Sequence, residues 1–275
     1  MFKGKFIIAV PARLESSRLP NKVLEDISGE PMLKRVLDRI NNSQINCKTL
    51  ICTDSETIKK LVEDWGFEVI KTKKNCSSGT ERISSVLDQI IEQTWNINCN
   101  KVKKDTYTKL LKETFIMNIQ ADQPLLSKKL LKECIDEIMN NYDNQIITPI
   151  YPLQKEEIHD PNIVKVINSK TNKALYFSRS PIPYARGINK DEWYKYNQYW
   201  GHVGIYCYRA DFLSNIDFLS KSRLEDMEKL EQLRFLDAGY TIHCFKTENQ
   251  TLSVDNISQL NKVRELYRIS SHLHD

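Results

Sequence analysis

The sequence predicts an α/β protein with a Rossmann-like, mostly parallel sheet flanked by helices. Strand-like apolar runs alternate with segments of helical periodicity over roughly the first half of the chain, which is typical of βαβ units. Residues 6–10 (FIIAV) form an unbroken apolar run, as expected of a strand buried on both faces. At 275 residues the chain can form one large core or two modest domains, and no repeat or obvious linker divides it.

Composition and charge exclude several classes of protein. A net charge of +4 is too small to indicate a nucleic-acid partner, so none is expected. The seven cysteines are odd in number and contain no C-x-x-C pair, which favours reduced thiols over a disulfide framework or a zinc site. The chain shows no signal peptide and no apolar run of membrane-spanning length. We therefore expect a cytoplasmic protein with no membrane partner.

The first half of the chain predicts a regular succession of strands and helices. Strands are expected at 6–10, 48–53, 67–71 and 115–119, and helices at 31–41, 55–65, 81–93 and 128–141. Residues 96–114 interrupt this succession with Asn, Lys and Thr, and we interpret them as a surface insertion that is helical in part over 107–112.

From residue 148 onward the pattern changes to shorter strands separated by longer irregular segments. The candidate strands are 163–167, 174–177 and 203–208. A long helix is expected over 224–239, with Gly239 as its stop signal. Asn256 can cap a last helix over 257–272.

A polar loop with three cations follows the first predicted strand, which Pro11 is expected to end. The carboxyl ends of strands are where open α/β sheets bind ligands, and guanidinium and ammonium groups suit the oxygens of a polyphosphate. The loop matches neither glycine-rich phosphate motif, so side chains would hold the phosphates. A solvated basic loop is the general alternative, and the position after the strand favours the phosphate site. The loop contains Arg13, Ser16, Ser17, Arg18 and Lys22.

Two further polar loops follow later strands. The segment 77–82 (SSGTER) precedes a predicted helix whose N-terminus favours anions, and it supplies Ser78 and Arg82. By itself it could equally be a capping box. The segment 118–124 supplies Gln120 and Asp122, and a carboxylate just past a buried strand can bind a divalent cation on a nucleotide. An ordinary turn aspartate is the alternative for Asp122.

Taken together, these motifs resemble a known family. PAR-x-x-SSRLP-x-K, SGTER and N-x-Q-x-D-x-P are similar to the nucleotide half of the 3-deoxy-manno-octulosonate (Kdo) cytidylyltransferases, or CMP-Kdo synthetases. DPNIVKVI, ALYFSRSPIPY, HVGIYCYR, MEKLEQLR and the Val-Asp near the C-terminus resemble the second half of the same family. The resemblance covers nearly the whole chain outside the insertion.

The resemblance implies a single nucleotidyltransferase domain over residues 1–275. Residues 1–147 would be mainly nucleotide-binding, and 148–255 would form a smaller mixed sheet for sugar binding and dimer contact. Residues 256–275 would form the C-terminal helix. The implied enzyme is a homodimer that transfers CMP from CTP to an eight-carbon sugar acid with Mg²⁺, for lipopolysaccharide or capsule synthesis.

The family's site residues can be carried over to this sequence. The implied catalytic residues are Lys22, Arg18 and Asp122. The implied nucleotide-binding residues are Arg13, Ser16, Arg18, Lys22, Ser78, Arg82 and Gln120. The implied sugar-binding residues are Gln120, Arg179, His202, Tyr206, Glu231 and Gln232, and the implied metal ligands are Asp122 and Asp255. For Tyr206 burial in the core is the alternative, and a solvated helix face explains two of Glu225, Glu228 and Glu231.

The sequence departs from the family pattern at three positions. Ala121 and Ser253 stand where glycine is usual, and Gln123 stands where glutamate is usual. Glutamine at this position resembles the branch that handles an 8-amino Kdo analogue, so that analogue is an alternative sugar.

Three other functions remain open. A cytidylyltransferase for a sialic-type acid would share the first loop, but the SRSPIPY and MEKLEQLR segments favour a Kdo-like substrate. A nucleotide-sugar glycosyltransferase would need an Asp-x-Asp motif, whereas this loop offers Asp122 alone. A non-enzymatic nucleotide sensor would have no need for Lys22 together with both aspartates.

Overall fold

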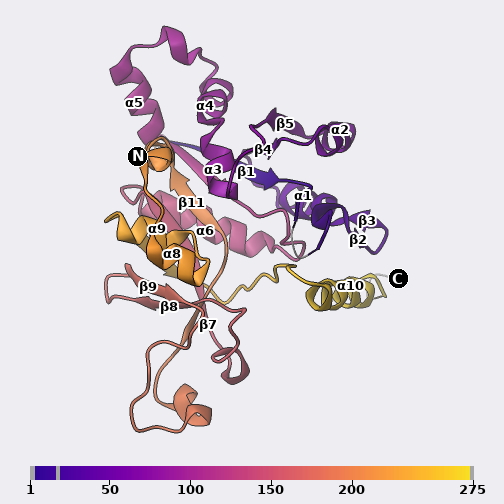
Figure 1. Ribbon diagram of the computed structural model, residues 1–275. Helices are drawn as coiled ribbons and strands as arrows, with labels where there is room; N and C mark the ends of the chain where they lie inside the picture. Colours follow the sequence, from indigo (N-terminus) through magenta and orange to yellow (C-terminus); the bar gives the residue numbers. More distant parts are fainter. Residues whose placement is uncertain (1–3, 17–18, 273–275) are drawn as a thin grey trace.

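The structure, a computed structural model, describes residues 4–16 and 19–272. A large sheet with helices on both faces forms its centre (Figure 1). Four strands of the first half pair in parallel, in the order β5 (Glu68–Lys71), β4 (Lys48–Thr53), β1 (Lys5–Ala12) and β6 (Thr114–Asn118). The predicted α/β class is therefore confirmed.

Strands of the second half extend the same sheet, mostly in antiparallel pairing. They follow in the order β11 (Tyr206–Arg209), β7 (Ile146–Pro152), β10 (Trp200–His202), β8 (Lys165–Asn168) and β9 (Ala174–Ser178), with β12 (Ile242–Lys246) parallel to β7. A separate hairpin of β2 (Asp26–Ile27) and β3 (Glu30–Pro31) follows the first polar loop. Strands from the second half of the sequence therefore continue the sheet that the strands of the first half begin.

Strand β1 is buried on both faces, as its sequence predicts. Ile8 and Val10 belong to one apolar cluster, and Ile7 and Ala9 belong to the other. The first cluster lies under α1 (Met32–Asn42), α2 (Glu56–Asp64) and α6 (Lys128–Asn140). The second lies under α3 (Gly79–Ser84), α4 (Leu87–Trp95), α5 (Lys104–Lys112), α7 (Ala210–Leu213) and α9 (Gln232–Asp237).

Two predicted helices are each broken in two. The helix expected over 81–93 is α3 followed by α4, because Ser85 bonds the carbonyl of Arg82 through its hydroxyl and Val86 leaves the helical region. The helix expected over 224–239 is α8 (Arg223–Glu228) followed by α9, since Lys229 adopts a left-handed conformation with φ 54°. This second break turns the chain so that Glu231 can point toward α3.

Three strand predictions also needed correction. Pro11 lies inside β1 and does not end it, because pairing with β6 stops at Ala9 and only β4 is paired beside Pro11. Of the strand expected over 203–208, only the part from Tyr206 onward forms a strand, β11; Val203 to Ile205 connect it to β10, which ends at His202. Strands β7 and β12 were not expected; Pro149 and Pro152 concealed β7.

The insertion and the C-terminal helix lie at the periphery of the sheet (Figure 1). Residues 96–114 project with α4 and α5, and α5 is longer than the helical part predicted. Helix α10 (Ile257–His272) begins as predicted, with the Asn256 side chain accepting from the amide of Gln259 at 2.9 Å. Short 3₁₀ helices complete the chain: η1 (Lys22–Leu24), η2 (Cys99–Lys101), η3 (Lys155–Glu157), η4 (Lys190–Lys195) and η5 (Ile216–Phe218). No described helix is both long and apolar enough to cross a membrane.

Candidate active site

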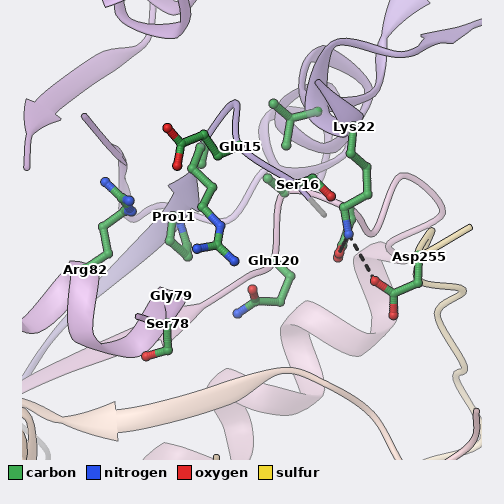
Figure 2. A pocket seen from close by; sticks show the side chains of 14 residues that line it. Pro11, Glu15, Ser16, Lys22, Ser78, Gly79, Arg82, Gln120 and Asp255 are labelled. Atoms are coloured by element: carbon green, nitrogen blue, oxygen red, sulfur yellow. Dashed lines mark hydrogen bonds and ion pairs between the residues drawn. The ribbon is translucent and has the colours of Figure 1, made fainter. Parts of the chain in front are cut away.

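A cavity of about 240 Å³ opens where the parallel strands end (Figure 2). The loops after β1 and β6, the N-terminus of α3 and the segment before α10 all contribute to its wall. The predicted residues that line it are Arg13, Ser16, Lys22, Ser78, Arg82, Gln120, Asp122 and Asp255. Segments more than two hundred residues apart in sequence thus meet at one edge of the sheet, where α/β folds bind ligands.

Lys22 lies between two carboxylates at this cavity. Its ammonium is 2.5 Å from Asp122 Oδ2 and 3.1 Å from Asp255 Oδ1. Burial opposes the charge of Lys22, but the two ion pairs outweigh that cost and raise its pKa above the usual value. Burial raises the pKa of Asp122, although Lys22 counteracts this effect. The two ion pairs therefore favour the charged form of Lys22, and its ammonium opposes the effect of burial on Asp122.

A backbone contact brings Asp255 to this position. The amide of Val254 donates to the carbonyl of Asp122 at 2.9 Å, so the chain before α10 runs beside the loop after β6. Val254 is fully buried with Ile27 and Leu260, which anchors the segment by apolar packing. The backbone contact and this small core therefore bring Asp255 to the cavity, although it is far from Asp122 in the sequence.

Gly79 allows a close approach at the floor of the cavity. A Cβ atom at this position would lie 2.8 Å from Pro11 Cγ and 3.3 Å from Gln120 Oε1. Glycine is therefore required for the Gln120 amide to pack against the start of α3. Gln120 also donates to Asn118 Oδ1 at 2.9 Å, which fixes the direction of its amide inside the cavity (Figure 2).

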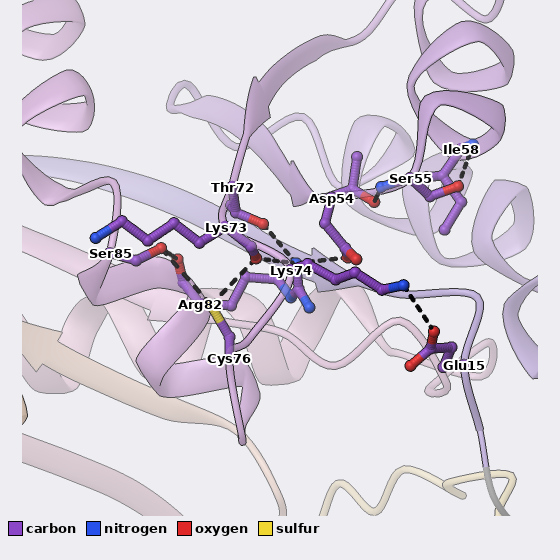
Figure 3. A network of polar contacts seen from close by, with 11 residues as sticks. Glu15, Asp54, Ser55, Ile58, Thr72, Lys73, Lys74, Cys76, Arg82 and Ser85 are labelled. Atoms are coloured by element: carbon purple, nitrogen blue, oxygen red, sulfur yellow. Dashed lines mark hydrogen bonds and ion pairs between the residues drawn. The ribbon is translucent and has the colours of Figure 1, made fainter.

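Arg82 lines the cavity but is held from behind by a polar network (Figure 3). Its Nη1 is 2.7 Å from Asp54 Oδ1 and also donates to the hydroxyl of Thr72. Only 3% of the Arg82 surface is exposed, so its charge needs the Asp54 carboxylate. The sequence interpretation missed Asp54, although it directly follows β4 and the rule for strand ends would have found it.

The predicted sugar-binding residues of the second half do not line this cavity. His202 and Tyr206 lie together, with ring centroids 5.2 Å apart. Burial lowers the pKa of His202 to about 3, so the imidazole is neutral at physiological pH. Thr148 donates its hydroxyl hydrogen to the Ile205 carbonyl at 2.7 Å and must accept from His202 Nε2 at 3.0 Å. His202 therefore presents Nδ1 as an acceptor.

Tyr206 lies in the core, which is the alternative that the sequence left open for it. It is 8% exposed and stacks on Tyr208 with centroids 5.4 Å apart, so it is part of the core. Its buried hydroxyl has no hydrogen-bond partner within the described part of the chain. Such an unsatisfied group is costly unless a ligand or water completes it.

Arg179, which follows β9, and Gln232 also belong to the predicted sugar-binding set. Arg179 donates from Nε to the Glu228 carbonyl at 2.9 Å and from Nη1 to the Pro161 carbonyl at 3.1 Å. These contacts use two of the five donors of a guanidinium. Gln232, the first residue of α9, is buried.

Glu231 connects the second half to the start of α3. One carboxylate oxygen accepts from the Ser78 hydroxyl, and the other accepts from Thr80 Oγ1 at 2.6 Å. Burial raises the pKa of Glu231, and the two hydroxyl bonds counteract this effect. Glu225 and Glu228 have other partners: Glu225 pairs with Arg234, and Glu228 accepts from Ser178.

The carboxylates of Asp122 and Asp255 are suited to a hard divalent cation. No group of three or more His, Cys, Asp and Glu that could hold a metal occurs among the residues the structure describes. The two aspartates nevertheless converge on one cation, the Lys22 ammonium. Mg²⁺ on a nucleotide takes one or two carboxylates plus phosphate oxygens, so this donor set fits. Arg18 and Ser17 lie outside the described residues.

Comparisons with known proteins identify the family. The family model for cytidylyltransferases matches residues 7–242. The 3-deoxy-manno-octulosonate cytidylyltransferase of Francisella tularensis subsp. holarctica is 34% identical over 264 residues, covering 95% of this chain and 98% of the relative. That of Chlorobaculum tepidum is 34% identical over 266 residues, covering 95% and 97%. The chain belongs to the Kdo cytidylyltransferase family.

Solved structures agree with this membership. A CMP:2-keto-3-deoxy-manno-octonic acid synthetase complexed with CTP is 33% identical, with a TM-score of 0.80 and coverage of 97% of this chain and 99% of that one. HddC from Yersinia pseudotuberculosis, complexed with GMP-PN, is 13% identical and shares the fold alone, with a TM-score of 0.62 and coverage of 95% and 99%. As a member of the Kdo cytidylyltransferase family, the chain is a nucleotidyltransferase.

Proposed function

We propose that the protein transfers CMP from CTP to the anomeric hydroxyl of Kdo and releases pyrophosphate. The observation that carries this proposal is the meeting of Lys22, Asp122 and Asp255 at a cavity lined by Ser78 and Gln120. Support comes from relatives named for this activity and from the CTP-bound synthetase of similar structure. The anomeric oxygen forms a bond to the α-phosphorus as the bond to pyrophosphate breaks, and the hydroxyl proton is released.

Charges of the first half would bind and stabilise the phosphates. Arg13 and Lys22 would hold the triphosphate, with Arg18 and Ser16 from the same loop. The Lys22 ammonium would stabilise the negative charge that develops on the leaving pyrophosphate. Mg²⁺ held by Asp122 and Asp255 would neutralise the phosphates and lower the pKa of the sugar hydroxyl.

Hydrogen-bonding groups and one arginine of the second half would orient the sugar acid. Arg179 retains donors for a bidentate bond to the carboxylate of Kdo. His202 Nδ1 can accept from a sugar hydroxyl, and the Tyr206 hydroxyl has an unmet hydrogen bond among the described residues. Glu231 and Gln232 complete the set, and Ser78 and Arg82 would face the nucleotide. Gln120 would lie between the nucleotide and the sugar.

Gln123 makes the 8-amino analogue of Kdo the second candidate. This residue is fully buried, its Nε2 lies 3.5 Å from Ser253 Oγ, and its Oε1 has no partner among described residues. A carbonyl oxygen without a donor suits an amino group better than another acceptor. Ala121, which stands where glycine is usual in the family, lines the cavity proposed here to bind the nucleotide.

Turnover with defined substrates tests the proposed function. Pyrophosphate release is measured with CTP and, in turn, Kdo, 8-amino-Kdo and a sialic-type acid; ATP, GTP and UTP replace CTP in a second series. We expect CTP to be preferred and one of the two eight-carbon acids to turn over. Turnover of the sialic-type acid alone would refute the Kdo proposal, and equal use of ATP would refute cytidine selectivity.

The same assay with Gln123→Glu decides between the two sugars. If Gln123 selects Kdo, the ratio of kcat/KM for 8-amino-Kdo to that for Kdo should rise with a carboxylate, which attracts an ammonium. If glutamine already binds the amine, the wild type should prefer the analogue. Gln123→Met is the matched control, since it retains the size of the side chain without its polar atoms.

The family resemblance also motivates a proposal on the assembly and location of the protein. We propose a homodimer in the cytoplasm that supplies CMP-Kdo for lipopolysaccharide or capsule synthesis. All seven cysteines are free thiols, in agreement with a reducing compartment. Sedimentation or light scattering at working concentration tests the dimer, and a single-chain mass would refute it.

A further inference from the structure

A buried hydroxyl lies where the two halves of the site meet. Thr80 is the second residue of α3, is 2% exposed, and has no role in the sequence interpretation. Its Oγ1 lies 2.6 Å from Glu231 Oε2, 3.4 Å from the Tyr208 hydroxyl and 3.5 Å from Asn118 Nδ2. One oxygen atom therefore contacts three side chains: Asn118 of β6, Tyr208 of β11, and Glu231 in the turn before α9.

The bond to Glu231 determines the direction of the others. A threonine hydroxyl has a single hydrogen, and Thr80 donates it to Glu231 Oε2. Its lone pairs then accept from Tyr208 and from Asn118 Nδ2. The Asn118 amide is oriented as a result, with Oδ1 directed to accept from Gln120 Nε2 at 2.9 Å.

These hydrogen bonds connect a residue of the proposed nucleotide site with a residue of the proposed sugar site. Gln120 lines the nucleotide cavity, whereas Glu231 belongs to the sugar-binding set. Between them lie only Asn118 and Thr80, which are 1% and 2% exposed. Solvent is thus largely excluded, and buried hydrogen bonds of this kind hold a single arrangement.

We infer that Thr80 is a positioning residue whose hydroxyl fixes the Glu231 carboxylate and, through Asn118, the amide of Gln120. The inference rests on the proposed function, because it takes Glu231 and Gln120 as contacts of the substrates. Without the hydroxyl, Glu231 would keep only the Ser78 donor, and the Asn118 amide would lose the group that orients it. Sugar binding should suffer more than nucleotide binding, since the shortest bond of Thr80, at 2.6 Å, is to Glu231 on the sugar side.

The first experiment compares Thr80→Val, which has the same shape without the hydroxyl, with Thr80→Ser, which retains it. For Thr80→Val we expect kcat/KM for the sugar to fall about tenfold to a hundredfold, as for loss of one charge-assisted hydrogen bond. The dissociation constant for CTP, measured by calorimetry, should remain within about twofold. Thr80→Ser should restore most of the loss. Tyr208→Phe, which leaves the bond to Glu231 intact, is the matched control and should cost much less.

A double-mutant cycle with Glu231→Gln tests whether Thr80 acts through Glu231. In the Glu231→Gln background, Thr80→Val should cost less than about threefold, because the interaction is already lost. Equal losses in both backgrounds, or no rescue by serine, would overturn the inference. If Thr80→Val does not fold, Thr80→Ala takes its place in the cycle. Absence of turnover with both eight-carbon acids in the wild type would instead refute the proposed function, so the two failures are distinguishable.

Discussion

The two halves of the site use different physical means to hold their side chains. Around the nucleotide cavity, charged groups on loops neutralise one another, as Lys22 does with Asp122 and Asp255. In the second half, His202 is neutral and Tyr206 is packed in the core. Charged groups such as these suit the phosphates of a nucleotide, and buried neutral groups suit the hydroxyls of a sugar. Changes in the first region should therefore affect chemistry, whereas changes in the second should affect sugar binding and acid stability.

Removal of the central charge of the nucleotide cavity should have the largest effect. Lys22→Ala should lower kcat by about a hundredfold or more, by analogy with loss of one transition-state donor. Lys22 is the first residue of the short 3₁₀ helix η1 and its side chain is partly exposed, so the fold should persist, as circular dichroism would show. Lys22→Arg is the control that keeps the charge but changes its shape. Near-normal turnover of Lys22→Ala would contradict the assignment.

A single methyl group at Gly79 should have the next largest effect. The added Cβ would lie 2.8 Å from Pro11 Cγ and 3.3 Å from Gln120 Oε1, so the Gln120 amide must shift. We expect Gly79→Ala to lower kcat/KM for CTP by about tenfold, a typical cost of misplacing a binding group. Gly29→Ala is the control: it has φ +89° and open space, so it should reduce stability without changing turnover. An unchanged kcat/KM for Gly79→Ala would show that Gln120 tolerates the shift.

Local patterns predicted the first region of the molecule better than the second. The rule that ligands bind at the ends of parallel strands placed Lys22, Ser78 and Asp122 at one edge, and the structure brings them to one cavity. Asp255 could be placed only by resemblance, because its approach depends on the Val254 backbone contact and on a small core.

The second region depends on breaks that propensity does not reveal. A left-handed residue at Lys229 ends α8 and turns Glu231 toward α3, whereas helical periodicity predicts an unbroken helix. The prolines in β7 concealed a central strand for a related reason. A strand accepts proline only where no ladder hydrogen bond is needed, and this depends on how the neighbouring strands pair with it. The contacts that select one glutamate among three therefore arise only when distant segments pack.

Acidification should reveal the neutral histidine of the second region. The pKa of His202 is about 3 in the folded state, below its ordinary value of 6.5, because the ring is buried. Between these values only the unfolded state binds the proton, so stability is complete above pH 6.5 and falls as the pH drops toward 3. We expect His202→Gln to reduce this slope by up to about 1.4 kcal/mol per pH unit. Urea unfolding of both proteins from pH 4 to pH 7, at about one-unit steps, measures the difference, and equal slopes would contradict a buried neutral ring.

The insertion, residues 96–114, belongs to neither half of the site, so a substitution there should have the smallest effect on turnover. Tyr107 of α5 donates its hydroxyl to Asp88 of α4, and no residue of 96–114 lines the nucleotide cavity. Tyr107→Phe should cost about 0.5–1.5 kcal/mol of unfolding free energy, the usual worth of one hydrogen bond. Turnover should not change, since the variant alters only the contact between two peripheral helices. Tyr196→Phe, which alters another exposed tyrosine, serves as the control for the loss of a hydroxyl at the surface. A fall in kcat/KM for Tyr107→Phe alone would mean that the insertion acts on the site, because stability loss of this size leaves the native state fully populated.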